Sequence, residues 1–270
     1  MSALDLLDDF GFEAAAIVLG PEGERARRGD VGRERRWRSV SKSVTGMACV
    51  LAAQEGLLSL DAPLEDHIEG VTLRHLLSHA SGYRYGSKEI ACAPEARRHY
   101  SNFAVDCAGE ELARVAGCEF SQWVQERIAA PLQTSTLHWT EPPSVGAVGS
   151  LEDLARFAHE LLAPTLLKPA WFSEMTSAQF PQLDGILPGL KMQRPNPFGL
   201  GVEIRGHKSP HWTGAHNDPA TIGHYGMRGC VFWVDPAAQL ALVVGTERDF
   251  GDAHRRVLPA LSDAVLADYA

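Results

Sequence analysis

Stretches that favour β-strands occur at both ends of the chain, whereas the middle is dominated by stretches that favour helices. Near the N-terminus, residues 13–20 (EAAAIVLG) and 25–30 (RARRGD) flank a Pro-Glu-Gly turn, which is typical of two connected strands. Near the C-terminus, residues 229–247 (GCVFWVDPAAQLALVVGTE) contain two β-rich runs around an Asp-Pro turn. Because consecutive hairpins build antiparallel sheets, this distribution predicts an α+β fold with one antiparallel sheet assembled from both ends of the chain and a helical region inserted between them.

The helices are predicted from the spacing of apolar residues. Positions 44, 47, 48, 51 and 52 form one apolar face of a helix that ends at Gly56. Further helices are expected at 103–117, 120–132, 150–162 and 252–270, and Ser150 precedes Asp153 by three residues in a capping-box pattern. Residues 181–201 are rich in Pro and Gly and read as a loop or crossover. We therefore expect a sheet-containing region made of residues 1–75 and 195–270, a mainly helical region at 76–194, and an active site in the cleft between them.

Composition narrows the class of protein. A length of 270 residues fits one large domain or two closely packed ones, and a net charge of −9 argues against nucleic acid or an anionic membrane as the main partner. The first twenty residues lack the basic region of a secretory signal, and no apolar run approaches the ~18 residues needed to span a bilayer. The five cysteines show no CxxC spacing, which favours reduced thiols. We expect a cytoplasmic protein; the sequence does not indicate its oligomeric state.

The stretch RWRSVSKSVTG, residues 36–46, carries a lysine in a chain whose positive charge is mostly arginine. If a helix begins near residue 40, Ser39, Lys42 and Ser43 share a face and Ser41 points elsewhere. Ser39 alone stands at the helix N-terminus, where free N–H groups favour a developing oxyanion. A serine needs a base beside it to act as a nucleophile, and a lysine of lowered pKa can be that base where an arginine cannot. A capped helix with a solvated lysine would show the same pattern.

Two further motifs accompany this stretch. HYSNF supplies Tyr100, a phenol able to relay a proton, and Asn102, a carboxamide able to hold a lysine. GHYGMRG supplies His224 and Gly226 directly before a β-rich run. An HxG pattern alone carries no information in this chain, whereas a YxN pattern is expected by chance only ~0.06 times. The three motifs together therefore indicate a site.

In this order, the three motifs resemble those of the penicillin-recognising serine hydrolases, which include class C β-lactamases, D-alanyl-D-alanine carboxypeptidases and family VIII carboxylesterases. Longer stretches are similar to the same superfamily in the same order, from about Phe12 to the last helix: EGLLSLDAPL, TLRHLLSHASG, GSLEDLARF, FGLGVEI and GHYGMRGCVFWVDPAAQLALVVGTE. The resemblance implies a β-lactamase/transpeptidase-like fold, with the YxN motif on the helical region and the HxG motif on a strand that lines the cleft.

The resemblance also implies residue roles. Ser39 would form an acyl-enzyme, Lys42 would be the general base, and Tyr100 would share the proton transfers to the leaving group and water. Asn102 would orient both Lys42 and the substrate.

The C-terminal motif completes the implied site. His224 stands where related enzymes have a lysine and would guide a proton or bind an acidic group. The backbone N–H groups of Ser39 and Met227 would form the oxyanion hole, and Gly226 would let the strand approach the substrate closely. Arg228 would meet a substrate carboxylate or form a surface salt bridge.

The chain departs from the family pattern at three positions. Phe103 and Ala104 follow the YSN motif where small residues are more usual, and would narrow the cleft. Arg38 precedes the nucleophile, where it either lowers the pKa of Lys42 or is simply solvated.

Other candidate sites are weaker. His75 and His79 lie four residues apart as a possible zinc half-site, but no third ligand is evident. His211 and His216 are expected in a loop that flanks the cleft. We expect no metal and no cofactor, and the absence of a GxSxG motif excludes an α/β-hydrolase elbow.

The sequence therefore predicts a serine hydrolase that acts on small esters or amides, most simply as a carboxylesterase. The missing export signal argues against peptidoglycan or an incoming β-lactam as the natural substrate. Two alternatives stay open: an acyltransferase that uses the same site, and a relative of the fold that binds a ligand or partner without turnover.

Overall fold

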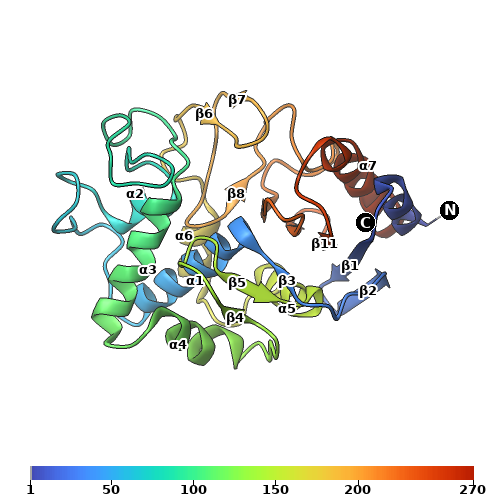
Figure 1. Ribbon diagram of the computed structural model, residues 1–270, viewed down its shortest axis with the longest axis horizontal. Coiled ribbons are helices and arrows are strands. Elements are labelled where there is room, and N and C mark those ends of the chain that lie inside the picture. The colour runs from blue at the N-terminus through green and yellow to red at the C-terminus, as the bar shows by residue number, and fades with distance from the viewer. Residues whose placement is uncertain (1) are drawn as a thin grey trace.

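The computed structural model describes residues 2–270, and its centre is a six-stranded antiparallel sheet (Figure 1). The strand order is β2-β1-β11-β10-β9-β8, and the first strand pairs with the last along its whole length, from Ala14 opposite Thr246 to Leu19 opposite Ala241. The strands are β1 Ala14–Gly20, β2 Gly23–Arg28, β8 Glu203–Ile204, β9 Ile222–Tyr225, β10 Val231–Asp235 and β11 Leu240–Thr246. The prediction of one antiparallel sheet built from both ends of the chain is confirmed.

Helices cover both faces of this sheet. On one face, α7 (Asp252–Tyr269) packs with the N-terminal 3-10 helix η1 (Ala3–Phe10), at the right of Figure 1. On the other face, α5 (Leu151–Leu162) crosses β1, β10 and β11. The side chains of β1 alternate between the two layers, with Ile17 in the core on the α5 side and Val18 in the core beneath α7. This alternation fixes the register of the strand.

The second part of the molecule is built around α1 (Ser41–Gln54), which contacts α3 (Asn102–Ala116) and α6 (Pro169–Thr176). The helix was predicted to have one apolar face, but residues 41–53 are all buried. Small residues on its other face make this possible: a Cβ at Gly46 would lie 2.2 Å from the carbonyl oxygen of Leu200. The chain around Leu200 therefore packs directly on the helix backbone.

The remaining elements are short. The helices α2 (Leu73–Leu77) and α4 (Phe120–Val124) lie with α3 at the left of Figure 1, and the π-helical turn η3 (Gln125–Ala129) extends α4. Two small sheets were not predicted: β3 (Arg35–Arg36), β5 (Ala147–Gly149) and β4 (His138–Trp139) form one, and the hairpin β6 (Gly185–Ile186) and β7 (Met192–Gln193) forms the other. The hairpin lies inside the segment that was expected to be a loop.

The start of α5 is capped by a side chain that the sequence predicts. The Ser150 hydroxyl accepts a hydrogen bond from the Asp153 backbone N–H at 3.1 Å, as the capping pattern predicts. The Asp153 carboxylate does not return the bond to residue 150; it accepts from Ser135 and Thr136 instead. The capping box is therefore half formed, and its acidic member ties the helix to the preceding loop.

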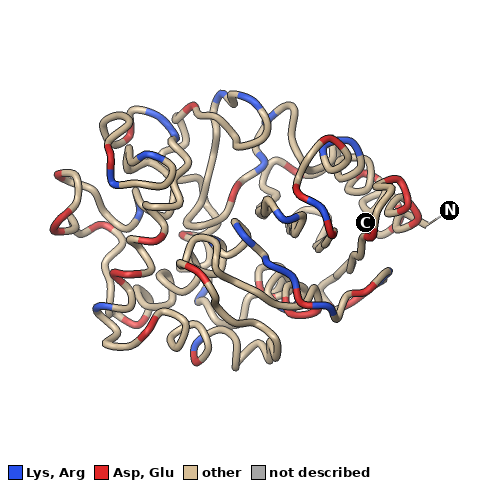
Figure 2. Tube along the Cα trace, in the orientation of Figure 1, with Lys and Arg blue, Asp and Glu red and all other residues tan. Residues whose placement is uncertain are grey.

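The sheet and the helical region share elements across the predicted boundaries. The helix α5 comes from the middle of the chain yet covers the sheet, and α1 comes from the first segment yet packs against α3. Basic and acidic residues are interspersed along the trace (Figure 2). In the part of the chain that the structure describes, no helix is both long and apolar enough to cross a membrane.

Candidate active site

Three serines surround Lys42, and the structure gives each of them a different environment. The Nζ atom of Lys42 lies 3.2 Å from Oγ of Ser39 and donates to the carbonyl oxygen of Ser144 at 3.0 Å. Ser41 accepts a hydrogen bond from the Ala147 N–H, and Ser43 donates to the Gly201 carbonyl. Ser39 belongs to the 3-10 turn η2 (Arg38–Val40), which runs directly into α1. Only Ser39 therefore combines a helix start with a lysine one turn away.

The charge of Lys42 is set by its surroundings. The side chain is fully buried, and loss of solvation lowers the pKa of its ammonium to about 7. The carboxylate of Asp106 opposes this shift and the guanidinium of Arg38 adds to it. Asp106 is half-buried on α3 and accepts a hydrogen bond from the Ser144 backbone N–H at 2.8 Å. Asp106 therefore holds Ser144, whose carbonyl oxygen contacts Lys42. An amine of this pKa is partly neutral at pH 7 and able to accept a proton.

The residue before Ser39 has an unusual backbone conformation. Arg38 has φ of +52°, a conformation that costs a residue with a side chain on the order of 1 kcal/mol. Its guanidinium forms an ion pair with Glu141. Of the two alternatives left open for Arg38, the structure combines both: the side chain is partly exposed, and its charge still reaches Lys42.

Tyr100 and His224 meet beside Ser39. The Tyr100 hydroxyl lies 3.4 Å from Nε2 of His224, and Lys42 Nζ lies 5.0 Å from the centre of the Tyr100 ring. Nδ1 of His224 faces the Tyr225 carbonyl oxygen at 3.0 Å, and because a carbonyl only accepts, Nδ1 must carry the proton. The Nε2 lone pair is then left to accept from Tyr100.

Both groups are neutral near pH 7. Burial lowers the pKa of His224 to about 4, with the charge of Lys42 contributing. Loss of solvation raises the pKa of Tyr100 above its ordinary range. A neutral imidazole does not bind an acidic group as a cation would, so the geometry favours the proton-guiding alternative for His224.

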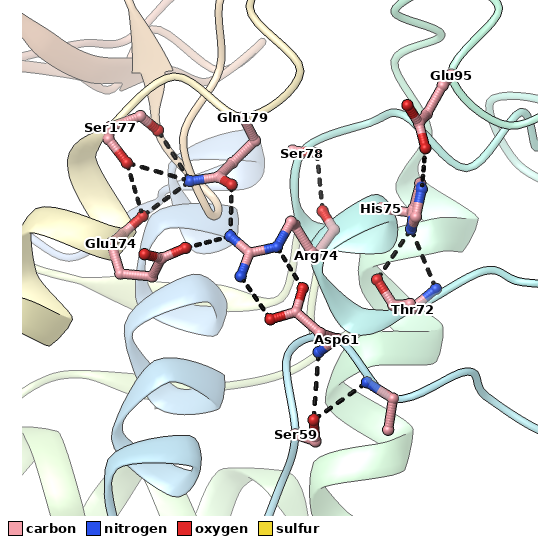
Figure 3. A network of polar contacts seen from close by, with 11 residues as sticks. Ser59, Asp61, Thr72, Arg74, His75, Ser78, Glu95, Glu174, Ser177 and Gln179 are labelled. Atoms are coloured by element: carbon pink, nitrogen blue, oxygen red, sulfur yellow. Dashed lines mark hydrogen bonds and ion pairs between the residues drawn. The ribbon is translucent and has the colours of Figure 1, made fainter.

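The two histidines of the HLLSH stretch, His75 and His79, lie in different surroundings. His75 lies between Thr72 and Glu95, with its two ring nitrogens 2.9 Å and 3.1 Å from their oxygens (Figure 3). His79 is buried, with its ring centre 4.3 Å from that of Tyr100, and its Nδ1 accepts the Ser101 N–H. Residues 2–270 contain no cluster of three His, Cys, Asp or Glu side chains placed to hold a metal ion. His79 packs against the Tyr100 ring.

The chain at the end of β9 closely approaches the segment that leads into Ser39. A Cβ at Gly226 would lie 2.1 Å from the carbonyl oxygen of Trp37, so only glycine permits this contact. The next residue, Met227, lines the same small pocket as Ser39. Neither the Ser39 nor the Met227 backbone N–H has an acceptor within residues 2–270, as the geometry of an oxyanion hole requires.

The structure places Asn102 differently from the expectation and matches one of the two alternatives left open for Arg228. The Asn102 side-chain oxygen is buried without a partner among residues 2–270, and Lys42 is oriented by Ser144 instead. Ser101, rather than Asn102, caps α3, which leaves the Asn102 side chain free of a structural bond there. Arg228 is exposed and pairs with Asp249 at 2.9 Å, so the structure corresponds to the surface salt bridge and not to a pocket residue.

The residues after the YSN motif do not narrow the pocket. Phe103 packs edge-on against Tyr83 with ring centres 5.1 Å apart, and Ala104 is buried in the core. The reactive pocket is instead lined by Ser39 together with Tyr85, Tyr100, Leu187, Pro188, Glu203, His224, Tyr225 and Met227.

A buried carboxylate in this pocket was not predicted from the sequence. Glu203 is 1% exposed and bonds Lys208 at 2.9 Å, His211 at 2.8 Å and the Trp212 indole N–H at 2.8 Å. These donors hold the pKa of Glu203 below its ordinary value despite burial. Of the two histidines expected beside the cleft, His211 belongs to this network, and His216 is exposed. No motif marks Glu203, because its partners follow it in an irregular loop.

The comparisons with known proteins agree with this geometry. Residues 35–267 match the family described as Beta-lactamase. The chain belongs to the beta-lactamase family. No curated protein matches the chain.

Solved structures of the beta-lactamase family extend the likeness over the whole chain. A beta-lactamase from Mycobacterium bovis is 43% identical, with 99% of each chain covered and a TM-score of 0.96. Simvastatin synthase from Aspergillus terreus is 17% identical, with 98% and 96% covered and a TM-score of 0.83. EstCE1, a hydrolase with promiscuous acyltransferase activity, is 18% identical, with 98% and 96% covered and a TM-score of 0.80. The protein therefore has the fold of the β-lactamase-like serine hydrolases, which supports its being an enzyme.

Proposed function

We propose that the protein is a carboxylesterase-type serine hydrolase that cleaves small esters or amides through an acyl-enzyme on Ser39. The observation that carries the proposal is the contact of 3.2 Å between Ser39 Oγ and the buried Nζ of Lys42, whose pKa is lowered to about 7. A neutral amine in that position is the base that a serine nucleophile needs.

In the acylation step, neutral Lys42 takes the proton of Ser39, and Oγ forms a bond to the substrate carbonyl carbon. The oxyanion that develops is stabilised by the backbone N–H groups of Ser39 and Met227. When the tetrahedral intermediate collapses, the bond to the leaving group breaks and a proton must reach the departing oxygen or nitrogen. Tyr100 is the proposed relay: its hydroxyl, which lies in the same pocket, gives its proton to the leaving group and regains one from the Lys42 ammonium, so that both groups end the step neutral.

Deacylation uses the same groups in reverse. A water molecule gives up a proton, which Tyr100 relays to neutral Lys42, as the water oxygen attacks the acyl carbon; the Lys42 ammonium then returns a proton to Ser39 Oγ as the ester bond breaks. In the resting site Nε2 of His224 faces the Tyr100 hydroxyl, so His224 orients the phenol while it stays neutral itself.

The test is an active-site label. The protein is treated with a fluorophosphonate, and the adduct is located by tandem mass spectrometry, while turnover is followed with 4-nitrophenyl acetate and nitrocefin. We expect an adduct on Ser39 and ester hydrolysis that is lost in Ser39→Ala. Ser43→Ala is the matched control, since Ser43 is also close to Lys42 in the sequence but donates to a backbone carbonyl. A label on Ser43, or no label and no turnover across a panel of esters and amides, contradicts the proposal.

Acyl transfer is the second candidate, since the same acyl-enzyme serves both reactions. The named activity of EstCE1, a hydrolase with promiscuous acyltransferase activity, supports testing it. Adding an alcohol such as 1-butanol to the ester assay separates the two reactions: an acyltransferase yields the butyl ester in place of the free acid. A protein that only binds a ligand yields neither product and no label.

A further inference from the structure

A second cavity opens directly beside the reactive pocket. It has a volume of about 220 Å³, and it shares Tyr85, Tyr100 and Pro188 with the pocket that contains Ser39. A group bound there would therefore lie next to the bond that Ser39 attacks. For scale, a cavity of ~150 Å³ holds a benzene ring, so this one has room for about eight carbon atoms.

The mouth of this site concentrates exposed apolar side chains. Within residues 2–270, the large apolar side chains that are exposed are Leu57, Tyr85, Ile90, Ile186, Met192 and Met227. Tyr85, Ile186 and Met192 line the second cavity, and Met227 lines the reactive pocket. An apolar patch at the entrance of a pocket marks a binding site for apolar groups more often than a random surface does.

The walls of the cavity are held in place by the protein itself. Ile186 and Met192 come from the two strands of the β6–β7 hairpin, and the Tyr225 hydroxyl donates to the Pro188 carbonyl. Beneath them, the buried guanidinium of Arg98 donates to backbone carbonyls of Ser78, Gln179 and Asn196. Because these donors are used internally, Arg98 supports the cavity rather than offering its charge to a ligand.

We infer that the cavity binds an apolar alkyl or aryl group of the substrate, of about six to eight carbon atoms, in contact with Tyr85, Ile186 and Met192. The inference rests on the proposed hydrolase function and specifies its substrate class. No carboxylate lines the cavity in the described chain, and its one exposed cation, Arg97, stands at the rim, so an ammonium-bearing group is disfavoured. The apolar group belongs to either the acyl or the alcohol part of the substrate.

Two ester series distinguish these sources. In the first, the acyl chain of 4-nitrophenyl esters grows from acetate to dodecanoate; in the second, acetate esters carry alcohols from ethanol to dodecanol. Fully burying one methylene is worth about a fourfold gain. Because the cavity is open on one side and buries each methylene only in part, we expect kcat/KM to rise on the order of 10- to 100-fold in one series and to level off near eight carbons. A flat profile in both series overturns the inference.

Matched variants place the effect in the cavity. Ile186 and Ile90 are 58% and 59% exposed, but only Ile186 lines the cavity. We expect Ile186→Asp to bring the ratio of kcat/KM for octanoate to that for acetate close to one, and Ile90→Asp to keep the ratio of the wild type. Met192→Asp provides a second variant in the same wall. Loss of the gain in Ile90→Asp, or its retention in both wall variants, contradicts the inference.

Binding separates this inference from the hydrolase proposal. Methyl ketones resemble esters but are not hydrolysed, and they can be titrated calorimetrically into Ser39→Ala. Affinity that rises from 2-butanone to 2-decanone, and falls again when Ile186→Asp is added, supports the cavity even if no ester is turned over. Equal affinity along the series rejects the cavity even if Ser39 is shown to be the nucleophile.

Discussion

Lys42 is the residue on which the proposed chemistry depends most directly, because its neutral form has to accept the Ser39 proton. Lys42→Arg keeps a cation next to Ser39 but removes the possibility of deprotonation near neutral pH. We expect kcat/KM for 4-nitrophenyl acetate to fall at least about 1000-fold, with the circular dichroism spectrum unchanged. A rate within tenfold of wild type would contradict the role of base.

The same amine sets the pH dependence of the reaction. Since Lys42 must lose its proton to act and its pKa is about 7, kcat/KM should fall tenfold per pH unit below about 7 and level off above it. The groups that face Lys42 are Arg38, Asp106, His79 and His224, and the two histidines stay neutral because their pKa values are lowered.

The carboxylate of Asp106 should help to set the pH at which this acidic limb falls, an effect that a purely structural role of Asp106 would not produce. Its carboxylate raises the pKa of Lys42, so Asp106→Asn should lower that pKa and move the acidic limb to lower pH. Asp249→Asn, an exposed carboxylate paired with Arg228, is the control and should leave the limb in place. A limb that stays fixed in Asp106→Asn would show that Asp106 acts only through packing.

The sequence identified side chains that lie together in the candidate site, but not the groups that hold them. Ser39, Lys42, Tyr100 and His224 lie together because their motifs need particular residue types, and type is visible in a sequence. The Ser144 carbonyl that orients Lys42 is a backbone atom, which any residue could supply, so no pattern reveals it. Glu203 escaped notice for a related reason, since its charge is balanced by partners without regular spacing.

The contact between β9 and the turn η2 positions the proposed oxyanion hole. Adding a methyl group at Gly226 would force the strand away from Trp37 and move the Met227 N–H with it. We expect Gly226→Ala to reduce kcat by at least about 100-fold, the cost of losing one oxyanion donor. Gly32→Ala is the matched control, because a Cβ there meets nothing within 4 Å. Equal kinetics of the two variants would rule out this close approach.

The start of α5 carries a buried anchor next to an exposed charge. Asp153 is 0% exposed and accepts from the backbone N–H groups of Ser135 and Thr136, whereas its neighbour Glu152 forms a surface ion pair with Arg27. Asp153→Ala removes a buried carboxylate together with both of these charge-assisted hydrogen bonds, and should lower the free energy of unfolding by about 3 kcal/mol. Glu152→Ala should change it by less than ~0.5 kcal/mol. Urea denaturation measures the free energy of unfolding of both variants, and similar values would contradict a stabilising role of Asp153.

Helices and strands were predicted well where the residue pattern agrees with the packing. They were predicted less well where they depend on contacts between segments that are distant in the sequence. The terminal strands and α7 follow from β-rich and helical runs, and the sheet confirms them. The burial of α1 on all sides depends on Gly46 meeting the chain near Leu200, a contact between distant segments. Likewise, the three-stranded sheet of β3, β4 and β5 consists of two- and three-residue strands, too short for any periodicity.

The predicted division into a sheet region and a helical region has a direct test in unfolding. Because α1 and α5 each connect the two regions, we expect one cooperative transition in urea. Tryptophan fluorescence, far-ultraviolet circular dichroism and ester hydrolysis should then share one midpoint. A separate early transition that abolishes hydrolysis while the β-sheet signal persists would instead establish 76–194 as an independent folding unit.

The pairing of β1 with β11 also determines when the protein can first become active during its synthesis. The apolar strand β1 leaves the ribosome early, but its partner residues 241–246 follow only near the end of translation. At ~5–20 residues per second, β1 waits on the order of 10 to 50 s for that partner. During this interval the edge of β1 carries unpaired backbone N–H and C=O groups that can pair with other chains. For most of it the nascent chain also lacks β9, which completes the pocket around Ser39. The proposed hydrolysis therefore becomes possible only after the last strand has been added.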